Sequence, residues 1–545
     1  MTARSEFDWM AVAKTGLLAG VVATFLALVG VIEASGGRQV VIGVLSVGQI
    51  LLLVPFIWAG SRAMRQPAGD DQQSSADRWT KVGGSVLAGL LTGVVLGMLV
   101  FVGGMLNLRT VFIKASPTLF NMLTLGVGTG PGALIPPIVG AILGGLTAGL
   151  ALLRRRIRTA VSLGLASVPL VAILSSALFA GRGLQPHNAL LVFLLVGGVS
   201  LLWSANRDKL RSRVESLPPR GQKNLRYGVW ALAGVAVLLL PQLGPYPSQV
   251  LNLVGLYVLM GLGLNIVVGF AGLLDLGYVA FFAMGAYTMG VLTSPEIGWL
   301  GVQLTFWEAL PFAMLVAFLS GIMLGIPVLG MRGDYLAIAT LGFGEIIRLV
   351  ALSDWLKPYI GGSNGITRIP KPILGPVALD NPQTLYYLII AGCLLVAFVS
   401  VRVKDSRLGR AWMAMREDED VAQAVGINLI HTKLMAFATG ATFSGLSGAI
   451  FASMLTSIYP HSFHLLVSIN TLCLIIVGGM GSIPGVIVGS LALVGLPELL
   501  REFAEYRLLF YGAALVIMML TRPEGLLPEA RRRLELHEGD LGAGE

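Results

Sequence analysis

The sequence is poor in charged residues and in cysteine. Only 12% of its 545 residues are Asp, Glu, Lys or Arg, about half of the roughly 25% found in soluble domains. Such a chain cannot cover a water-facing surface with polar side chains, which excludes a large soluble enzyme. Its two cysteines, Cys393 and Cys473, lie in apolar runs, so neither a disulfide framework nor a cysteine metal cluster is expected.

Motifs of bond-making chemistry are also missing from the sequence. It has no G-x-x-x-x-G-K-[ST] run to cradle a phosphate, no H-E-x-x-H zinc motif and no G-x-S-x-G nucleophile turn. His461 and His464 lie beside Pro460 and are interpreted as an interfacial pair without a ligand. We therefore expect no catalytic residue, no metal and no cofactor. No interleaving of basic and aromatic residues suggests a nucleic-acid partner.

Long apolar runs dominate the sequence instead. Hydrophobic residues make up 55% of it, in continuous rather than alternating runs, which favours helices over a membrane barrel. At roughly 17–25 residues per span, the fold class is an all-α polytopic membrane protein with about 14–16 transmembrane or re-entrant helices. Six spans are expected in the first part of the chain, at about 14–32, 40–60, 82–105, 133–153, 159–180 and 188–204.

The basic residues predict the topology. The net charge is +9, and an excess of Lys and Arg marks the cytoplasmic loops of a membrane protein. Loops that begin near Arg62, Arg154 and Arg207 are basic, and the loops between them hold few basic residues. This alternation predicts three helical hairpins and a cytoplasmic N-terminus. The C-terminus is also expected in the cytoplasm, and the protein in a bacterial or archaeal inner membrane.

The predicted domain boundary is the basic segment 205–226. Seven Lys and Arg residues together with Pro218 and Pro219 are typical of a solvated linker. The expected organisation is an N-terminal membrane extension of about six helices at 1–204, a cytoplasmic linker at 205–226, a second membrane domain at 227–525 and a cytoplasmic tail at 526–545.

The second membrane domain contains shorter, glycine-rich apolar segments. Short or interrupted segments can be broken or re-entrant helices that line a transport path. The elements expected here lie at about 227–243, 250–272, 277–293, 309–330, 335–352, 384–401, 433–457, 467–480, 486–498 and 508–521.

Two long loops interrupt this domain. The segment 402–432 begins with basic residues, turns acidic at Glu417, and predicts a short helix that ends at Gly426. It is either a docking element for a partner or an ordinary solvated loop. The proline-rich segment 353–383 predicts an ordered, non-helical loop on the opposite face.

Ionisable residues in apolar segments are costly and therefore functional candidates. Asp275 lies between Gly272 and Gly277, and belongs either to a bend near the transport path or to a tight turn at the cytoplasmic surface. Glu345 and Arg348 are three residues apart and can meet on one helix face, either as path residues or as an internal ion pair.

Small and amide residues in the apolar runs predict helix contacts. Asn265 and Asn470 are expected to form interhelical hydrogen bonds, although both could also line the path. Glycines let membrane helices approach closely. The glycines expected at helix contacts are Gly126, Gly128, Gly130, Gly132, Gly140, Gly144 and Gly145.

Several runs in residues 250–525 occur in an order typical of one family. They lie at 262–269, 271–282, 285–287, 333–338, 340–346, 361–366, 407–410, 426–428 and 478–485. Together they resemble the permease subunits of ABC importers for branched-chain amino acids, of the LivM type, over about half of the chain. Residues 1–204 carry none of these runs, and a fused scaffold, an assembly surface and a degenerate partner permease remain open for them.

The resemblance implies an integral permease, embedded in membrane lipids, that pairs with a LivH-like second permease. Two cytoplasmic ABC ATPases would drive it, and an extracytoplasmic substrate-binding protein would deliver a small amino acid. The segment 405–430 resembles the family's coupling element. The coupling residues carried over are Arg410, Glu417, Ala422, Ala424 and Gly426, and the candidate path residues are Asn265, Asp275, Glu345, Arg348 and Asn470.

The leading hypothesis is therefore a permease subunit of an ABC importer for branched-chain amino acids, or related amino acids and amides. An alternative is an ATP-independent secondary transporter or channel for small solutes, which would need carboxylates such as Asp275 and Glu345 at the membrane midplane. A third possibility is a membrane scaffold without a transport role.

Overall fold

The computed structural model describes residues 7–65, 75–179, 183–215, 234–297 and 303–499, and single positions at 228, 232 and between 512 and 528. The chain divides into two compact units, Met1–Trp230 and Ala231–Glu545, and each is described separately. The expected linker beyond residue 215, the span at 508–521 and the tail at 526–545 lie wholly or largely outside the described residues.

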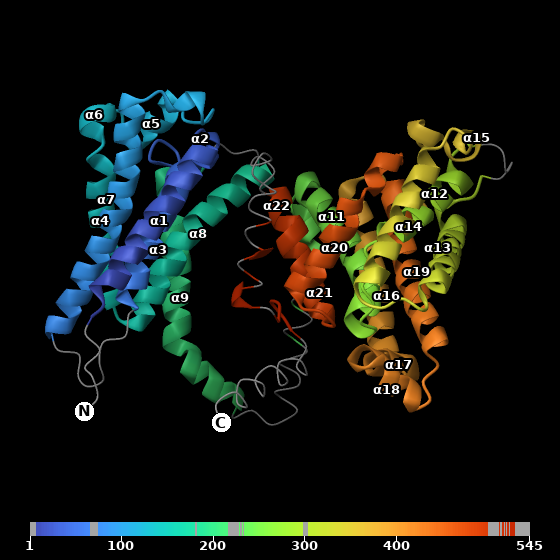
Figure 1. Ribbon diagram of the computed structural model, residues 1–545. Coiled ribbons are helices and arrows are strands. Elements are labelled where there is room, and N and C mark those ends of the chain that lie inside the picture. The colour runs from blue at the N-terminus through green and yellow to red at the C-terminus, as the bar shows by residue number, and fades with distance from the viewer. Residues whose placement is uncertain are drawn as a thin grey trace. The chain divides into compact units, whose positions relative to one another are not determined.

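The first unit is a helical bundle (Figure 1). Its long helices are α1 (Trp9–Val29), α3 (Val47–Met64), α4 (Ser75–Met105), α7 (Ile135–Leu152), α8 (Arg155–Phe179) and α9 (Pro186–Glu215). The short elements between them are α2 (Val31–Ala34), β1 (Gln39–Val41), β2 (Leu45–Ser46), η1 (Leu108–Thr110), α5 (Pro117–Leu123) and α6 (Thr129–Gly132). Each of the six spans expected here overlaps one of these long helices.

Small residues hold helix α4 against α7. A Cβ on Gly89 would lie 2.1 Å from the Gly140 carbonyl oxygen, so the two backbones are in direct contact. The Ser85 hydroxyl donates to the Gly144 carbonyl at 2.8 Å across the same interface. Lipid tails are as apolar as the helices, so close packing and interhelical hydrogen bonds of this kind drive association. The expected contacts at Gly140 and Gly144 are confirmed.

The other glycines of this region differ from expectation. A Cβ on Gly126, Gly128 or Gly130 would meet nothing within 4 Å, so the prediction of helix contacts is wrong for these three. Gly126 and Gly128 have φ values of 82° and 94°, a backbone conformation that favours glycine, so these two positions need glycine for the turn rather than for a helix contact. Gly132 packs against Thr124, as expected for a contact, whereas Gly145 has only an ordinary 3.9 Å neighbour.

The span expected at 40–60 begins later than predicted. Residues 39–46 form an antiparallel hairpin of β1 and β2, turned through Gly43 at φ 74°. Helix α3 then starts with a capping box, in which Ser46 and Gln49 each accept from the other's backbone N–H. The apolar pattern did not separate hairpin from helix because both are apolar here.

The second unit contains more and shorter helices. Its principal helices are α11 (Pro245–Leu264), α12 (Val279–Thr293), α13 (Phe306–Val328), α14 (Asp334–Leu352), α16 (Pro382–Lys404), α17 (Arg407–Glu417), α18 (Glu419–Ala424), α19 (Leu429–Leu455), α20 (Leu465–Gly478), α21 (Ile483–Ser490) and α22 (Leu496–Leu499). The minor elements are η2 (Leu240–Leu243), η3 (Asn265–Phe270), α15 (Lys357–Ile360), η4 (Gly362–Asn364), β3 (Ile373–Leu374), β4 (Val377–Ala378), η5 (Pro460–Phe463) and η6 (Leu491–Gly495).

Helices α11, α12 and α19 form the centre of the second unit. Glycines bring them together: a Cβ on Gly448 of α19 would lie 2.0 Å from the Phe282 carbonyl oxygen of α12. A single large apolar cluster extends from these helices to α13, α16 and α20. Helix α11 is therefore buried almost all round, as an inner helix of a membrane protein can be.

Two elements of this unit are interrupted. Helix α11 continues as the π-helix η3 to Phe270, so that the two form one apolar span, and the chain is then non-helical up to Val279. Helix α20 and the helices from α21 to Glu498 meet at 119°, either as a broken span or as a re-entrant loop. Of the short apolar segments expected here, those at 467–480 and 486–498 therefore form a broken or re-entrant element.

The two long loops lie at opposite ends of helix α16 (Figure 1). One end carries α17 and α18. The other carries α15, η4 and the antiparallel β3–β4 hairpin. The prediction of a non-helical loop at 353–383 is therefore wrong in part, because Lys357–Ile360 forms a helical turn that ends at Gly361 with φ 81°.

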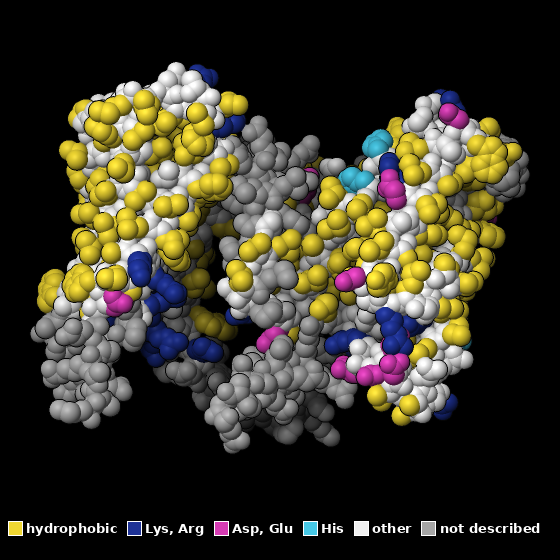
Figure 2. Space-filling model, in the orientation of Figure 1, with side chains coloured by type: hydrophobic (Ala, Val, Ile, Leu, Met, Phe, Trp, Pro, Cys, Tyr) yellow, Lys and Arg dark blue, Asp and Glu magenta, His cyan; other side chains and the backbone are white. Residues whose placement is uncertain are grey.

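The described residues contain ten helices that are long and apolar enough to cross a membrane, or eleven if the bent pair is one span. Shorter apolar helices lie at Gly234–Leu243 and Val279–Thr293. Hydrophobic side chains cover the flanks of both units, while most charged side chains gather toward the ends (Figure 2). The protein is a multi-pass membrane protein.

Candidate functional site

The interruption between α11 and α12 is anchored by Asn265. This side chain is 1% exposed, and its Oδ1 accepts from the Gly481 N–H at 2.9 Å. Gly481 belongs to the turn between α20 and α21, so one amide joins the π-helix to the bend of the other interrupted element. The expected interhelical hydrogen bond of Asn265 is confirmed.

The non-helical segment 271–278 is largely buried, apart from the exposed Gly272, and is held by side chains. The Leu276 N–H donates to Thr340 Oγ1 at 3.0 Å, and the Val279 N–H donates to Ser468 Oγ at 2.9 Å. The Tyr278 hydroxyl donates to the Gly440 carbonyl at 2.7 Å. Irregular backbone in a membrane protein needs protein groups to replace the missing helical hydrogen bonds, and these side chains and carbonyl groups do so here.

Asp275 lies at the centre of this segment and is fully buried. Its Oδ1 accepts from the Gly277 N–H at 2.9 Å, whereas Oδ2 has no partner among the described residues. Asp275 thus lies in a turn, and its carboxyl is enclosed by protein rather than exposed. The expected bend is present at Gly272, whose φ is 72°.

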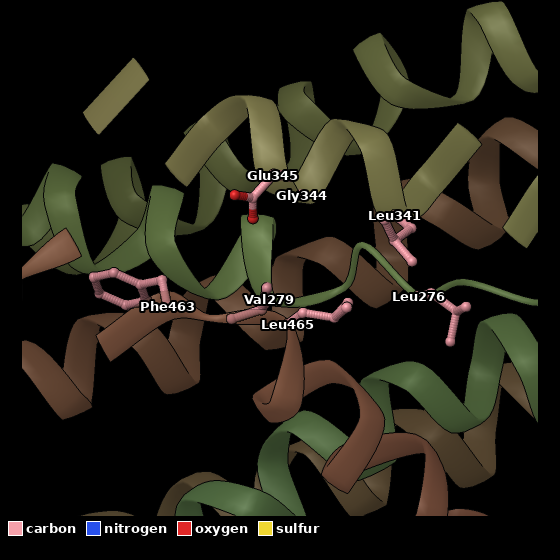
Figure 3. Close-up of a pocket in the computed structure, with 7 residues that line it drawn as sticks. All are labelled: Leu276, Val279, Leu341, Gly344, Glu345, Phe463 and Leu465. Atoms are coloured by element: carbon pink, nitrogen blue, oxygen red, sulfur yellow. The ribbon is translucent and has the colours of Figure 1, made fainter. Parts of the chain in front are cut away.

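A pocket of about 140 Å³ lies beside this segment (Figure 3). Helix α14 contributes Leu341, Gly344 and Glu345, while the start of α12 and the η5–α20 junction supply the facing wall. The remaining lining residues are Leu276, Val279, Phe463 and Leu465. In Figure 3 the Glu345 carboxylate projects from its helix toward Val279, so one charged group enters an otherwise apolar space.

Glu345 and Arg348 do meet on one face of α14. The Arg348 Nε donates to both carboxylate oxygens of Glu345, at 3.1 and 3.0 Å, and Nη2 donates to Oε1. The side chains are 42% and 26% exposed, so the pair is accessible and borders the pocket rather than being sealed in the core. The prediction that the two residues share a helix face is confirmed.

Asn470 differs from Asn265. It is half-buried on α20, and its side chain forms no hydrogen bond within the described part of the chain. The prediction of an interhelical hydrogen bond is therefore wrong for Asn470. The structure thus separates the two amides that the sequence treated alike: Asn265 pins two elements together, and Asn470 is available to another group.

The polar helix pair α17–α18 forms the second candidate site. Asp418 caps α18 by accepting from the N–H groups of Asp420 and Val421 at 2.8 and 2.9 Å. The helix ends in a Schellman motif, in which Gly426 and Ile427 donate to Gln423 and Ala422. The expected second helix and its end at Gly426 are confirmed, and φ of 92° explains the glycine.

The expected coupling residues are not equivalent. Arg410, Glu417, Ala424 and Gly426 are exposed, whereas Ala422 is 2% exposed and packs inward. Arg410 donates to the Asp405 carbonyl at 2.8 Å. Sequence analysis missed two exposed apolar side chains, Val421 and Val425, at 59% and 72% exposure. Their i, i+4 spacing places them on one face of α18 and was a readable signal.

Sequence analysis also missed how α17 and α18 are attached. Trp412 is fully buried and donates to the Thr432 carbonyl at 2.8 Å. Arg416 donates to the Gly269 carbonyl, at the end of the π-helix, at 2.7 Å. A direct contact therefore connects the helix pair to the interrupted element that leads to the pocket.

Charged contacts complete this attachment. The nearly buried Lys433 ammonium lies 2.9 Å from Glu419. Arg332 contacts Glu419 at 3.0 Å and Asp420 at 2.7 Å. The Arg332 hydrogen bond and charge lower the pKa of the Asp420 carboxyl, and the same contact raises the pKa of Arg332.

Metal binding has no support in the described part of the chain, where no group of three or more His, Cys, Asp or Glu side chains could hold an ion. An interrupted helix, a pocket lined by one charged residue and a polar helix pair at one end are together typical of a transport permease.

The comparisons with known proteins agree with this class. The family model described as branched-chain amino acid transport system / permease component matches residues 246–519. LivM, the high-affinity branched-chain amino acid transport system permease protein of Salmonella typhimurium, is 41% identical over 307 residues, covering 52% of this chain and 70% of that protein. No solved structure matches the chain.

Two further relatives extend the comparison. The LivM of Escherichia coli is 40% identical over 333 residues, covering 56% of this chain and 76% of that protein. The LivH permease protein of the same organism is 24% identical over 299 residues, covering 51% and 93%. The chain belongs to the branched-chain amino acid transport permease family.

Proposed function

We propose that this protein is the LivM-type permease subunit of an ABC importer that moves branched-chain amino acids across the inner membrane. The main support is the family membership of residues 246–519. The proposed transport domain spans 227–525, and residues 1–204 are a membrane extension joined to it by a basic cytoplasmic linker at 205–226. The chain's termini, including the tail 526–545, are proposed to be cytoplasmic.

The proposed partners are a LivH-like second permease, two cytoplasmic ATPases and an extracytoplasmic substrate-binding protein. The α17–α18 pair is the proposed ATPase-docking surface, with Arg410, Glu417, Ala424 and Gly426 exposed on it and Ala422 packing it against the unit. Val421 and Val425 support this role, since two neighbouring apolar side chains at a water-facing end favour a protein partner.

The proposed path follows the pocket face of α14 and α20. Glu345, Arg348 and Asn470 are its proposed polar groups, because all three side chains are partly exposed. Asn265 and Asp275 are proposed to position the path without contacting the solute, because both are buried and hold the interrupted backbone. When the ATPases close on nucleotide, they would displace α17, and Arg416 would carry that displacement to the segment before α12.

Co-purification with the native partners tests this function. Val421→Asp/Val425→Asp should abolish ATPase recovery and ATP-driven leucine uptake in proteoliposomes, since two carboxylates would be desolvated at the interface. The matched control is Val377→Asp on the β3–β4 hairpin at the other end of the unit, which should retain both. Leucine uptake by the chain alone, driven by an ion gradient, would contradict the proposal.

A further inference from the structure

We propose that Glu345, Arg348 and the adjoining pocket form a transient binding site for an α-amino acid. The Arg348 guanidinium would take the ligand carboxylate, Glu345 would take the ammonium, and the pocket would take an aliphatic side chain. This inference rests on the proposed function and names a site for it within this chain.

The charges of the pair match a zwitterion. Arg348 already holds a carboxylate through Nε and Nη2, the fork geometry that a ligand carboxylate would use. Glu345 is the one charged residue that lines the pocket. A ligand that inserts between the two residues exchanges one ion pair for two, and no charge is left unpaired.

The exposure of the pair makes this exchange feasible. With side chains 42% and 26% exposed, Glu345 and Arg348 can separate without breaking a buried network. Neither side chain is enclosed by the rest of the described structure, so the pair has room on one side to open. The pair lies on one helix at i, i+3, so α14 keeps both groups in place while their side chains change rotamer.

The pocket has the character and size for an aliphatic group. Apart from Glu345 and Gly344, its lining side chains are those of Leu276, Val279, Leu341, Phe463 and Leu465. Its volume is about 140 Å³. A cavity of about 150 Å³ lined by similar residues accommodates benzene, so the four carbon atoms of a leucine side chain fit. An apolar wall with one polar group is typical of a small-ligand site.

Equilibrium binding of radiolabelled leucine tests the site without interference from the binding protein. The chain would be purified with its partner permease and ATPases and placed in nanodiscs. Glu345→Gln and Arg348→Gln should each weaken leucine binding by about tenfold or more, because each leaves one ligand charge without its partner. Matched controls are Glu296→Gln and Arg368→Gln, which disrupt a 3.4 Å ion pair whose two residues do not line the pocket, and they should leave binding unchanged.

Two leucine analogues separate the roles of the two charges. Leucinamide lacks the carboxylate charge, so Arg348→Gln should change its competition less than twofold while Glu345→Gln weakens it. The reverse is expected for 4-methylpentanoate, which lacks the ammonium. Leu341→Ala should lower the preference for leucine over phenylalanine by about fivefold, since the pocket becomes larger.

The outcomes distinguish the inference from the proposed function. If the wild-type complex transports leucine and both charge variants bind it as tightly as wild type, the site is wrong and the importer stands. If the wild-type complex transports no leucine, the proposed function is wrong, and the site that rests on it is wrong as well. Should the single variants not assemble, Glu345→Gln/Arg348→Gln keeps a neutral hydrogen-bonding pair, and normal leucine binding by it would overturn the inference.

Discussion

The two units solve the same problem of packing helices in lipid in different ways. In the first unit the helices are regular, and only 6% of the residues in the apolar stretch of α9 are buried. In the second unit, 89% of the residues in the apolar stretch of α11 are buried. The helical structure there is interrupted around Asp275, between η3 and α12. Hydropathy treats α9 and α11 alike, so apolar composition shows that a helix enters the membrane and not what surrounds it there.

Their buried polar groups differ as well. The first unit buries hydroxyl groups such as Ser85 and Thr92, which donate to helix carbonyls. The first unit also buries the guanidinium nitrogens of Arg38, and the second unit buries an amide, a carboxyl and an amine, at Asn265, Asp275 and Lys433. In the second unit, Asn265 and Asp275 accept from backbone N–H groups outside the helices. Buried polar groups therefore join regular helices in the first unit and also hold non-helical backbone in the second.

The largest expected effect comes from Gly277→Val. A Cβ at this position would lie 1.8 Å from the Thr340 carbonyl oxygen, and backbone cannot move aside as a side chain can. We expect loss of folded protein and of leucine uptake, measured by size-exclusion chromatography and proteoliposome assay. Gly89→Val creates a similar clash in the first unit and should leave uptake at least partly intact. Equal loss in both variants would show that transport depends on both units.

Arg416→Met should uncouple ATP hydrolysis from transport. Methionine keeps much of the apolar stem but cannot donate to the Gly269 carbonyl, so α17 loses its contact with the π-helix. We expect leucine uptake to fall by about tenfold while basal ATPase activity is kept. Arg402→Met is the control, because Arg402 belongs to α16, where its guanidinium lies over the Phe398 ring, and is not one of the proposed coupling residues. A normal ratio of leucine to ATP would contradict this link.

Substitutions at Asp275 should have intermediate effects. Asp275→Asn keeps an oxygen to accept from the Gly277 N–H, whereas Asp275→Ala leaves that buried donor unpaired at a cost of about 1–3 kcal/mol. The melting temperature measured in detergent should therefore be highest for wild type, lower for Asp275→Asn and lowest for Asp275→Ala. If the Asn variant is as unstable as the Ala variant, the ionised carboxylate itself is required.

The smallest effect is expected at Asp420, outside the membrane. Arg332 lowers the pKa of Asp420 below its ordinary 3.8, so this contact stabilises the fold above that pH. The stabilisation is lost as the pH falls through the lowered pKa. Asp420→Asn should thus melt slightly below wild type at pH 7 and converge with it in strong acid. Added salt should reduce the difference, because the pair is exposed. Equal melting temperatures of wild type and Asp420→Asn at pH 7 and low salt would contradict this stabilising role.

Several features could be predicted from the sequence because they depend on local chemistry. The helix end at Gly426 follows from a position that needs positive φ. The meeting of Glu345 and Arg348 follows from helical spacing. By contrast, Asn265 and Asn470 have similar apolar neighbours in the sequence, and their different hydrogen bonding could not be predicted, since it depends on which helix lies opposite.

The amino-acid sequence by itself determined that this protein is a helical membrane protein, where most of its helices run, and which family its second half resembles. These depend on runs of apolar residues and on motifs contiguous in the chain. Only the tertiary structure decided that Asp275 is buried, that Arg416 contacts Gly269, and that Leu465 faces Glu345 across a pocket. Those contacts join residues far apart in the sequence, and packing rather than local preference brings them together.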